Sequence, residues 1–157
     1  MGKVRHPFRL IEVETIEAEN IELETIEVFL VEDNPADVLL VRVALSEVPL
    51  PLKLLVAKDG EQALKMLSSP AFQPRLIILD LNMPRVDGQT VLRQFQQEKI
   101  PIVIFSSTQN KAEVQKALTL GAREYVQKPV GFEAYAAAVR GIVKRWIGIP
   151  PGLPAAT

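Results

Sequence analysis

Short hydrophobic runs alternate with amphipathic segments along most of this chain. Five apolar runs predict β-strands at residues 27–31, 53–57, 76–79, 102–105 and 124–126. Between these runs, apolar residues recur at spacings of three and four, which predicts helices. The longest predicted helix covers Phe132–Trp146, and its apolar stripe consists of Phe132, Tyr135, Ala136, Val139, Ile142, Val143 and Trp146.

Two of the predicted helices carry clear end signals. Asn34 is a good N-cap for the first helix, Pro35 suits its first position, and Asp37 in the first turn favours the helix dipole. The fourth helix, marked by Val114, Ala117 and Leu118, is expected to end at Gly121, a residue that tolerates the left-handed conformation after a helix.

Regular alternation of strands and helices predicts a parallel sheet with helices on both faces. Right-handed crossovers and five strands favour the flavodoxin-like strand order 2-1-3-4-5. The continuous runs LIIL and IVIF are typical of strands that are buried on both faces. The sequence therefore predicts an α/β fold with a doubly wound, five-stranded parallel sheet over residues 26–146.

Two terminal segments lie outside this unit. Residues 1–25 are rich in glutamate, and isoleucine recurs every five residues at Ile11, Ile16 and Ile21 and again at Ile26, where the predicted domain begins. A period of five matches neither a helix nor a strand, which favours a flexible acidic extension; a fraying strand or helix is the alternative. Residues 147–157 (IGIPPGLPAAT) are expected to form an extended arm, because Pro150 and Pro151 cannot continue a helix.

Composition narrows the possible functions. The 157 residues are 48% hydrophobic and 24% charged, which fits one globular domain with tails. A net charge of −1 without a dense Lys/Arg cluster argues against nucleic-acid binding. No apolar run approaches the roughly 18 residues of a membrane-spanning helix. The absence of cysteine excludes disulfides and thiolate chemistry, so a cytoplasmic protein without membrane contact is expected.

Polar side chains follow four of the predicted strands. In an open parallel sheet, ligands bind outside the carboxyl ends of the strands, near the point where the strand order reverses. The first, third, fourth and fifth strands are neighbours in the predicted order, so the residues at their ends share one rim. These residues are Glu32 and Asp33, Asp80, Ser106, and Lys128.

This set of residues fits phosphoryl transfer. Three crowded carboxylates repel one another, and Mg²⁺ relieves that repulsion because it prefers oxygen ligands. Asp80 could then attack a phosphoryl group while Lys128 neutralises charge and Ser106 donates a hydrogen bond. Each residue alone has an ordinary interpretation as a helix cap, a turn residue or a surface lysine, but their coincidence at adjacent strand ends favours the functional one.

Four motifs resemble the receiver domain of two-component response regulators: VEDN (31–34), LDLNMPRVDG (79–88), FSS (105–107) and YVQKP (125–129). The resemblance implies that Asp80 is the phosphoacceptor. It implies Mg²⁺ ligands from the side chains of Glu32, Asp33 and Asp80 and from the backbone carbonyl of Asn82. It further implies phosphoryl contacts from Lys128 and Ser106, a cis peptide between Lys128 and Pro129, and a switch pair formed by Ser106 and Tyr125. For Tyr125, simple packing is the alternative.

LDLNMPRVDG together with VKRWIGIPP is similar to the stand-alone receivers that partner bacterial phytochrome histidine kinases. This similarity implies a sensor histidine kinase as partner, with a bacterial phytochrome as the candidate. It also implies a homodimer formed through Trp146, Ile147 and Ile149, which we expect in an exposed apolar strip. The chain departs from this subgroup in its short QQEKIP connection and its acidic leader.

The expected function is that of a single-domain response regulator, not an enzyme acting on other substrates. Phosphorylation would reshape the face made by the fourth helix, the fifth strand and the fifth helix. The alternative is a small aspartyl-phosphate phosphatase or phosphotransferase. It is disfavoured because Asn82 stands where a general acid or base is needed, and because no inserted cap encloses a substrate. A DNA-binding regulator would need a longer segment after Trp146.

Overall fold

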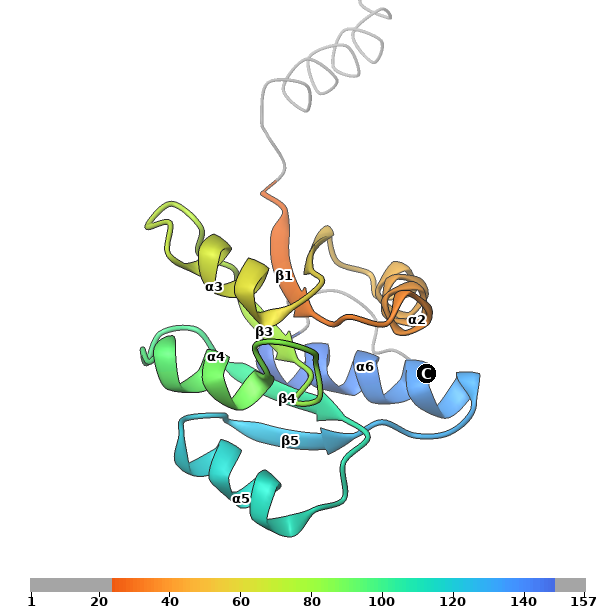
Figure 1. Ribbon diagram of the computed structural model, residues 1–157. Helices are drawn as coiled ribbons and strands as arrows, with labels where there is room; N and C mark the ends of the chain where they lie inside the picture. Colours follow the sequence, from red (N-terminus) through yellow and green to blue (C-terminus); the bar gives the residue numbers. More distant parts are fainter. Residues whose placement is uncertain (1–23, 149–157) are drawn as a thin grey trace, which may run out of the picture.

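The computed structural model describes residues 24–148, in which strands and helices alternate as predicted (Figure 1). The acidic extension up to residue 23 and the arm from residue 149 onward lie outside the described residues. The strands are β1 (Ile26–Val31), β2 (Leu52–Ala57), β3 (Leu76–Leu79), β4 (Ile102–Ser106) and β5 (Glu124–Gln127). The helices are α2 (Pro35–Ser46), α3 (Gly60–Leu67), α4 (Gly88–Gln94), α5 (Lys111–Thr119) and α6 (Phe132–Trp146).

All neighbouring strands are parallel, and their order is β2-β1-β3-β4-β5. This confirms the predicted fold class and strand order. In the register of the sheet, Val31 pairs with Leu79 and Leu79 pairs with Ile104, so β1, β3 and β4 end at the same rim. Helices α2 and α6 cover one face, and α3, α4 and α5 cover the other (Figure 1).

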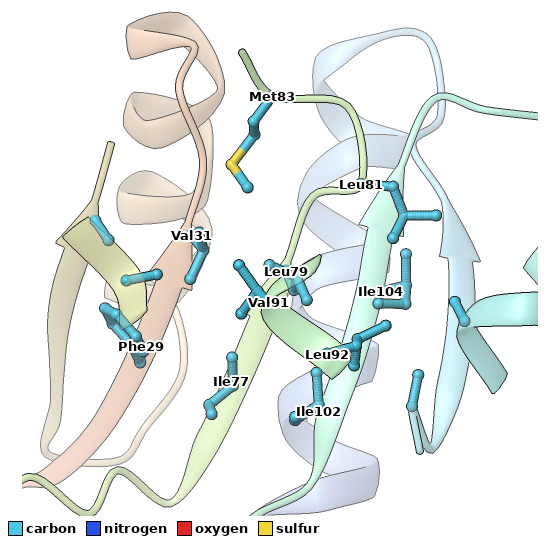
Figure 2. Close-up of a cluster of buried hydrophobic side chains, with 14 of the residues drawn as sticks. Phe29, Val31, Ile77, Leu79, Leu81, Met83, Val91, Leu92, Ile102 and Ile104 are labelled. Atoms are coloured by element: carbon cyan, nitrogen blue, oxygen red, sulfur yellow. The ribbon is translucent and has the colours of Figure 1, made fainter. Parts of the chain in front are cut away.

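The sheet separates two hydrophobic cores because successive side chains of a strand point to opposite faces. Phe29 and Val31 of β1 lie in the core beneath α3, α4 and α5, part of which Figure 2 shows. Val28 and Leu30 lie in the core beneath α2 and α6. All four residues of β3 are buried, as expected for a strand covered on both faces. Each such side chain contributes roughly 1.5–3 kcal/mol of burial free energy, which makes the central strands a rigid support.

Both predicted helix ends are confirmed. The Asn34 side chain accepts a hydrogen bond from the backbone N–H of Ala36 at 2.9 Å, which caps α2. Gly121 has φ +117° and its N–H donates to the carbonyl of Leu118, while the N–H of Ala122 donates to Ala117. These two bonds form a Schellman motif, which satisfies carbonyls left free at the end of α5.

Four apolar side chains differ from expectation. Leu118 and Phe132 are exposed, at 37% and 46%, although helical spacing placed both on apolar stripes. Each lies at an end of its helix, where spacing alone does not show whether the sheet still covers the stripe. The expected exposed strip is also wrong for Trp146 and Ile147, because both are half-buried against the core. The indole N–H of Trp146 donates to Glu124 at 2.7 Å, which satisfies its polar edge. Ile149 lies outside the described residues.

Among residues 24–148, no helix combines the length and the apolar composition that crossing a bilayer requires.

Candidate functional site

Three acids meet at the rim where β1 and β3 end. Glu32 is 2% exposed and Asp80 is 6% exposed, while Asp33 faces solvent. One carboxylate oxygen from each lies within 4.8 Å of the other two. The register explains this meeting, because the acids directly follow the paired residues Val31 and Leu79, and the N–H of Asp80 donates to the carbonyl of Val31 at 3.1 Å. The structure thus brings together the three acids that the sequence predicted.

Glu32 is fixed by one bond to each of its two oxygens. Its Oε2 accepts from the backbone N–H of Asn34 at 3.1 Å, and its Oε1 accepts from Lys128 Nζ at 2.6 Å. Burial raises the pKa of Glu32 from 4.5 to about 7, and the charge of Asp80 adds to this shift while the bond from Lys128 opposes it. The crowded acids therefore hold negative charge at a cost that a bound cation would reduce.

Lys128 lies at the end of β5 and reaches into the acids. Its Nζ lies 2.6 Å from Glu32, 3.6 Å from Asp37 and 3.7 Å from Asp80. Burial lowers the pKa of Lys128, but the hydrogen bond to Glu32 and the charges of Asp80, Glu32 and Asp37 outweigh it, so the net pKa is raised. Lys128 is accordingly a permanent cation next to the carboxylate of Asp80.

The expected cis peptide between Lys128 and Pro129 is wrong, because no cis peptide bond occurs in the part of the chain that the structure describes. The trans form before proline is favoured by about 0.5–1 kcal/mol in the absence of other constraints.

Asn82 and Ser106 border Asp80 on the side of β4. The backbone N–H of Asn82 donates to Asp80 Oδ1 at 3.3 Å, and its side-chain amide donates to the hydroxyl of Ser106 at 3.5 Å. Ser106 is fully buried at the end of β4. Both residues therefore adjoin the acid site, where the sequence placed them.

The turn after Asp80 depends on Gly88. The N–H of Gly88 donates to the carbonyl of Leu81 at 3.1 Å, which folds the start of α4 back against β3. A Cβ atom at Gly88 would lie 2.5 Å from the carbonyl oxygen of Asp80. Glycine is required here because the two backbone segments approach so closely.

Tyr125 lies beside the loop that links β4 to α5. Its ring is half-buried against the core, and its hydroxyl donates to the backbone carbonyl of Thr108 and, at 3.4 Å, to that of Ser106. Burial raises the pKa of Tyr125, so the hydroxyl stays protonated. Tyr125 thus contacts both ends of the Ser106–Thr108 segment, and its role in a switch stays a prediction.

Sequence reasoning missed two residues of the site. Asp37 was interpreted only as a helix-dipole residue, yet its carboxylate approaches Lys128. Tyr135 was counted in the apolar stripe of α6, yet its hydroxyl donates to Asp37 Oδ1 at 2.8 Å. A buried tyrosine hydroxyl needs a polar partner, and that requirement was the available signal.

The arrangement suits a divalent cation and a phosphoryl group. Three hard oxygen donors, one of them open to solvent, are typical of sites that Mg²⁺ or Mn²⁺ occupy. A lysine ammonium and a serine hydroxyl beside Asp80 supply the cation and the hydrogen-bond donor that phosphoryl oxygens require.

Comparison with known proteins agrees with this chemistry. Residues 28–140 match the family model described as the response regulator receiver domain. The probable methanogenesis regulatory protein FilR2 of Methanothrix harundinacea is 29% identical over 143 residues, which cover 86% of this chain and 90% of that protein. Response regulator Rcp1 of Synechocystis sp. is 32% identical over 131 residues, which cover 76% of this chain and 88% of that protein.

Two solved structures are closely similar. The phosphorylated cyanobacterial phytochrome response regulator RcpA aligns with a TM-score of 0.74 and 31% identity, over 79% of this chain and 95% of RcpA. The Mn²⁺-bound form of Rcp1 aligns with a TM-score of 0.73 and 29% identity, over 83% of this chain and 99% of Rcp1. The chain therefore belongs to the response regulator receiver family and is a two-component signalling protein rather than a catalytic enzyme.

Proposed function

We propose that Asp80 accepts a phosphoryl group from a sensor histidine kinase in a Mg²⁺-dependent reaction. The observation that carries this proposal is the convergence of Glu32, Asp33 and Lys128 on the carboxylate of Asp80. Family membership implies a cognate histidine kinase and sets aside the phosphatase alternative.

In the proposed step, one carboxylate oxygen of Asp80 attacks the phosphorus of a phosphohistidine. The bond between phosphorus and the imidazole nitrogen breaks, its electron pair stays on the imidazole, and an aspartyl phosphate remains on the chain. Lys128 neutralises charge on the transferred group because its ammonium is already 3.7 Å from Asp80. The hydroxyl of Ser106 donates to a phosphoryl oxygen.

The donor set fits Mg²⁺. The side chains of Glu32, Asp33 and Asp80 and the backbone carbonyl of Asn82 would hold the ion, since all four groups offer hard oxygen ligands. When bound, the ion neutralises charge on the phosphoryl oxygens. The Mn²⁺-bound structure of the relative Rcp1 supports a divalent cation in this family.

We propose Ser106 and Tyr125 as the switch pair. An aspartyl phosphate carries about −1.5 to −2 charges and draws the Ser106 hydroxyl toward it. That movement displaces the Ser106–Thr108 segment, to which the hydroxyl of Tyr125 donates its hydrogen bonds. The ring then turns inward, and the surface formed by α5, β5 and α6, which includes the exposed side chain of Leu118, changes shape.

A bacterial phytochrome kinase in the cytoplasm is the partner we favour, because the relative RcpA is described as a phytochrome response regulator. We further propose a homodimer through Trp146, Ile147 and Ile149. Trp146 and Ile147 are half-buried, so part of each side chain is open to such a contact, and Ile149 lies outside the described residues. Size-exclusion chromatography with and without residues 149–157 tests this assembly, and an unchanged elution volume contradicts it.

Acetyl phosphate with Mg²⁺ tests the central proposal. Intact-mass measurement should show one added phosphate on the wild type and none on Asp80→Asn or on the wild type in EDTA. Asp87→Asn is the matched control, because Asp87 lies in the same loop but caps α4 through Thr90. It should be labelled like the wild type. Equal labelling of Asp80→Asn would show that another residue accepts the phosphoryl group.

A further inference from the structure

The Lys128 ammonium has a third carboxylate neighbour, Asp37, which the proposed function does not use. Asp37 Oδ2 lies 3.6 Å from Lys128 Nζ, as close as the acceptor Asp80 at 3.7 Å. Glu32, at 2.6 Å, is closer but is also a proposed cation ligand. Asp37 is therefore the one carboxylate of these three that neither binds the cation nor receives the phosphoryl group.

Tyr135 fixes the orientation of Asp37. Its hydroxyl donates to Asp37 Oδ1 at 2.8 Å, which leaves Oδ2 to face Lys128. Tyr135 is 4% exposed, and its ring meets Phe105 edge to face at a centroid distance of 5.0 Å. Packing of the buried Tyr135 ring between α6 and β4 thus determines where the hydroxyl lies.

We infer that Asp37, oriented by Tyr135, is a positioning residue that holds the Lys128 ammonium beside Asp80. This inference rests on the proposed function. If Glu32 were to bind a cation, its pairing with Lys128 at 2.6 Å would weaken. Asp37, which is not one of the three clustered acids, would then remain as a counter-charge 3.6 Å from the ammonium and keep it within reach of the incoming phosphoryl group.

The contacts among Tyr135, Asp37 and Lys128 also connect α6 to the site around Asp80. Tyr135 projects from α6, Asp37 lies in the first turn of α2, and Lys128 follows β5. A displacement of α6 that breaks the Tyr135 bond would free the Asp37 carboxylate to rotate. Movement of the α5–β5–α6 surface and placement of Lys128 are then coupled through a single hydrogen bond.

Two variants isolate this role. Asp37→Asn is isosteric: its carbonyl can still accept from Tyr135, but an NH₂ group then faces the ammonium. Tyr135→Phe keeps every charge and removes only the hydroxyl that orients Asp37. Each is made in the wild type and in a Lys128→Met background, and Asp80 phosphorylation by acetyl phosphate is followed at saturating Mg²⁺ by intact mass. Glu133→Gln, which removes an exposed acid from the first turn of α6, is the control.

With Lys128 present, both variants should slow phosphorylation about 3- to 10-fold, a size that coupled neighbours commonly show. In the Lys128→Met background the same substitutions should change the rate less than about twofold, because the residue they position is gone. The ¹⁵N resonance of the Lys128 ammonium should shift in both variants and stay unchanged in Glu133→Gln.

Equal rate changes in the two backgrounds, or an unchanged Lys128 resonance, would overturn the inference, because Asp37 would then act only through fold or bulk charge. If the wild type is not labelled at Asp80, the proposed function fails instead. In that case the Lys128 resonance still shows whether Asp37 contacts the ammonium. Failure of the inference and failure of the proposed function are therefore distinguishable.

Discussion

Gly88→Ala tests whether the turn after β3 determines the position of Asp80, the proposed phosphoacceptor. Gly88 opens α4, and a Cβ atom there would lie 2.5 Å from the carbonyl oxygen of Asp80 and 2.8 Å from the Cα of Leu81. Both obstacles are backbone atoms, so no flexible side chain can move aside. The whole turn has to shift to admit one methyl group.

The size of the effect follows from these distances. Close C···O contacts in proteins lie at about 3.3–3.6 Å, so the turn at Gly88 must open by roughly 1 Å. Overpacking of this kind destabilises the fold by about 1–3 kcal/mol, and the better helix propensity of alanine offsets up to about 1 kcal/mol of that loss. We expect a net loss of about 1–2 kcal/mol in the free energy of unfolding. Since a misplacement of 1 Å in a reactive group can cost about 100-fold in rate, phosphorylation of Asp80 should slow at least tenfold.

Urea denaturation and the acetyl phosphate time course measure the two effects. Gly141→Ala is the matched control, because a Cβ atom there would meet only the far end of the Arg145 side chain, at 3.0 Å, and no backbone atom. That control should gain about 0.5–1 kcal/mol in stability and keep the wild-type phosphorylation rate. If Gly88→Ala is as stable as Gly141→Ala and is labelled equally fast, the turn does not position Asp80 in the way that the distances indicate.

Three further predictions concern other parts of the site and fold. In EDTA, the free energy of unfolding should fall as pH rises from about 4.5 to about 7, because burial raises the pKa of folded Glu32 to about 7 while the unfolded chain loses this proton near 4.5. Glu32→Gln should remove that part of the slope in urea titrations at several pH values, and an identical slope would contradict the assignment. Asn34→Ala should cost about 1 kcal/mol in urea denaturation, because the N–H of Ala36 loses its cap; an unchanged midpoint would show that this cap contributes nothing. Glu124→Ala should cost about 1 kcal/mol and shift the fluorescence of Trp146, the single tryptophan, to longer wavelength, because the half-buried indole N–H loses its acceptor and Arg145 loses its ion pair; unchanged emission would contradict the indole contact.

Local patterns were sufficient for most of the fold. The strand predictions agree with the structure to within one residue at each end, because apolar runs and caps are encoded in neighbouring residues. β4 and β5 each extend one residue further than their apolar runs, where Ser106 pairs with Gln127. Polar residues at a strand end give no hydrophobic signal, so pairing with the neighbouring strand determines where these two strands stop.

The candidate site was predictable only where topology alone brings residues together. The acids after β1 and β3 follow from the strand order, because the carboxyl ends of adjacent parallel strands meet at one rim. Asp37 and Tyr135 are 98 positions apart, and their contact depends on how α2 and α6 pack side by side on one face of the sheet. Sequence spacing does not encode that packing, and it does not encode the isomer of the peptide bond before Pro129 either.

The charges at the rim imply an order of events for the proposed function. When ionised, the four carboxylates of Glu32, Asp33, Asp37 and Asp80 exceed the one ammonium of Lys128 by three negative charges. Two like charges 4.8 Å apart repel by about 3 kcal/mol at an effective dielectric constant of about 20, so an incoming phosphoryl dianion meets a strongly unfavourable field. A divalent cation cancels two of the three charges. We therefore expect a cation to bind before the phosphoryl donor, and the exposed side chain of Asp33 would be its point of access.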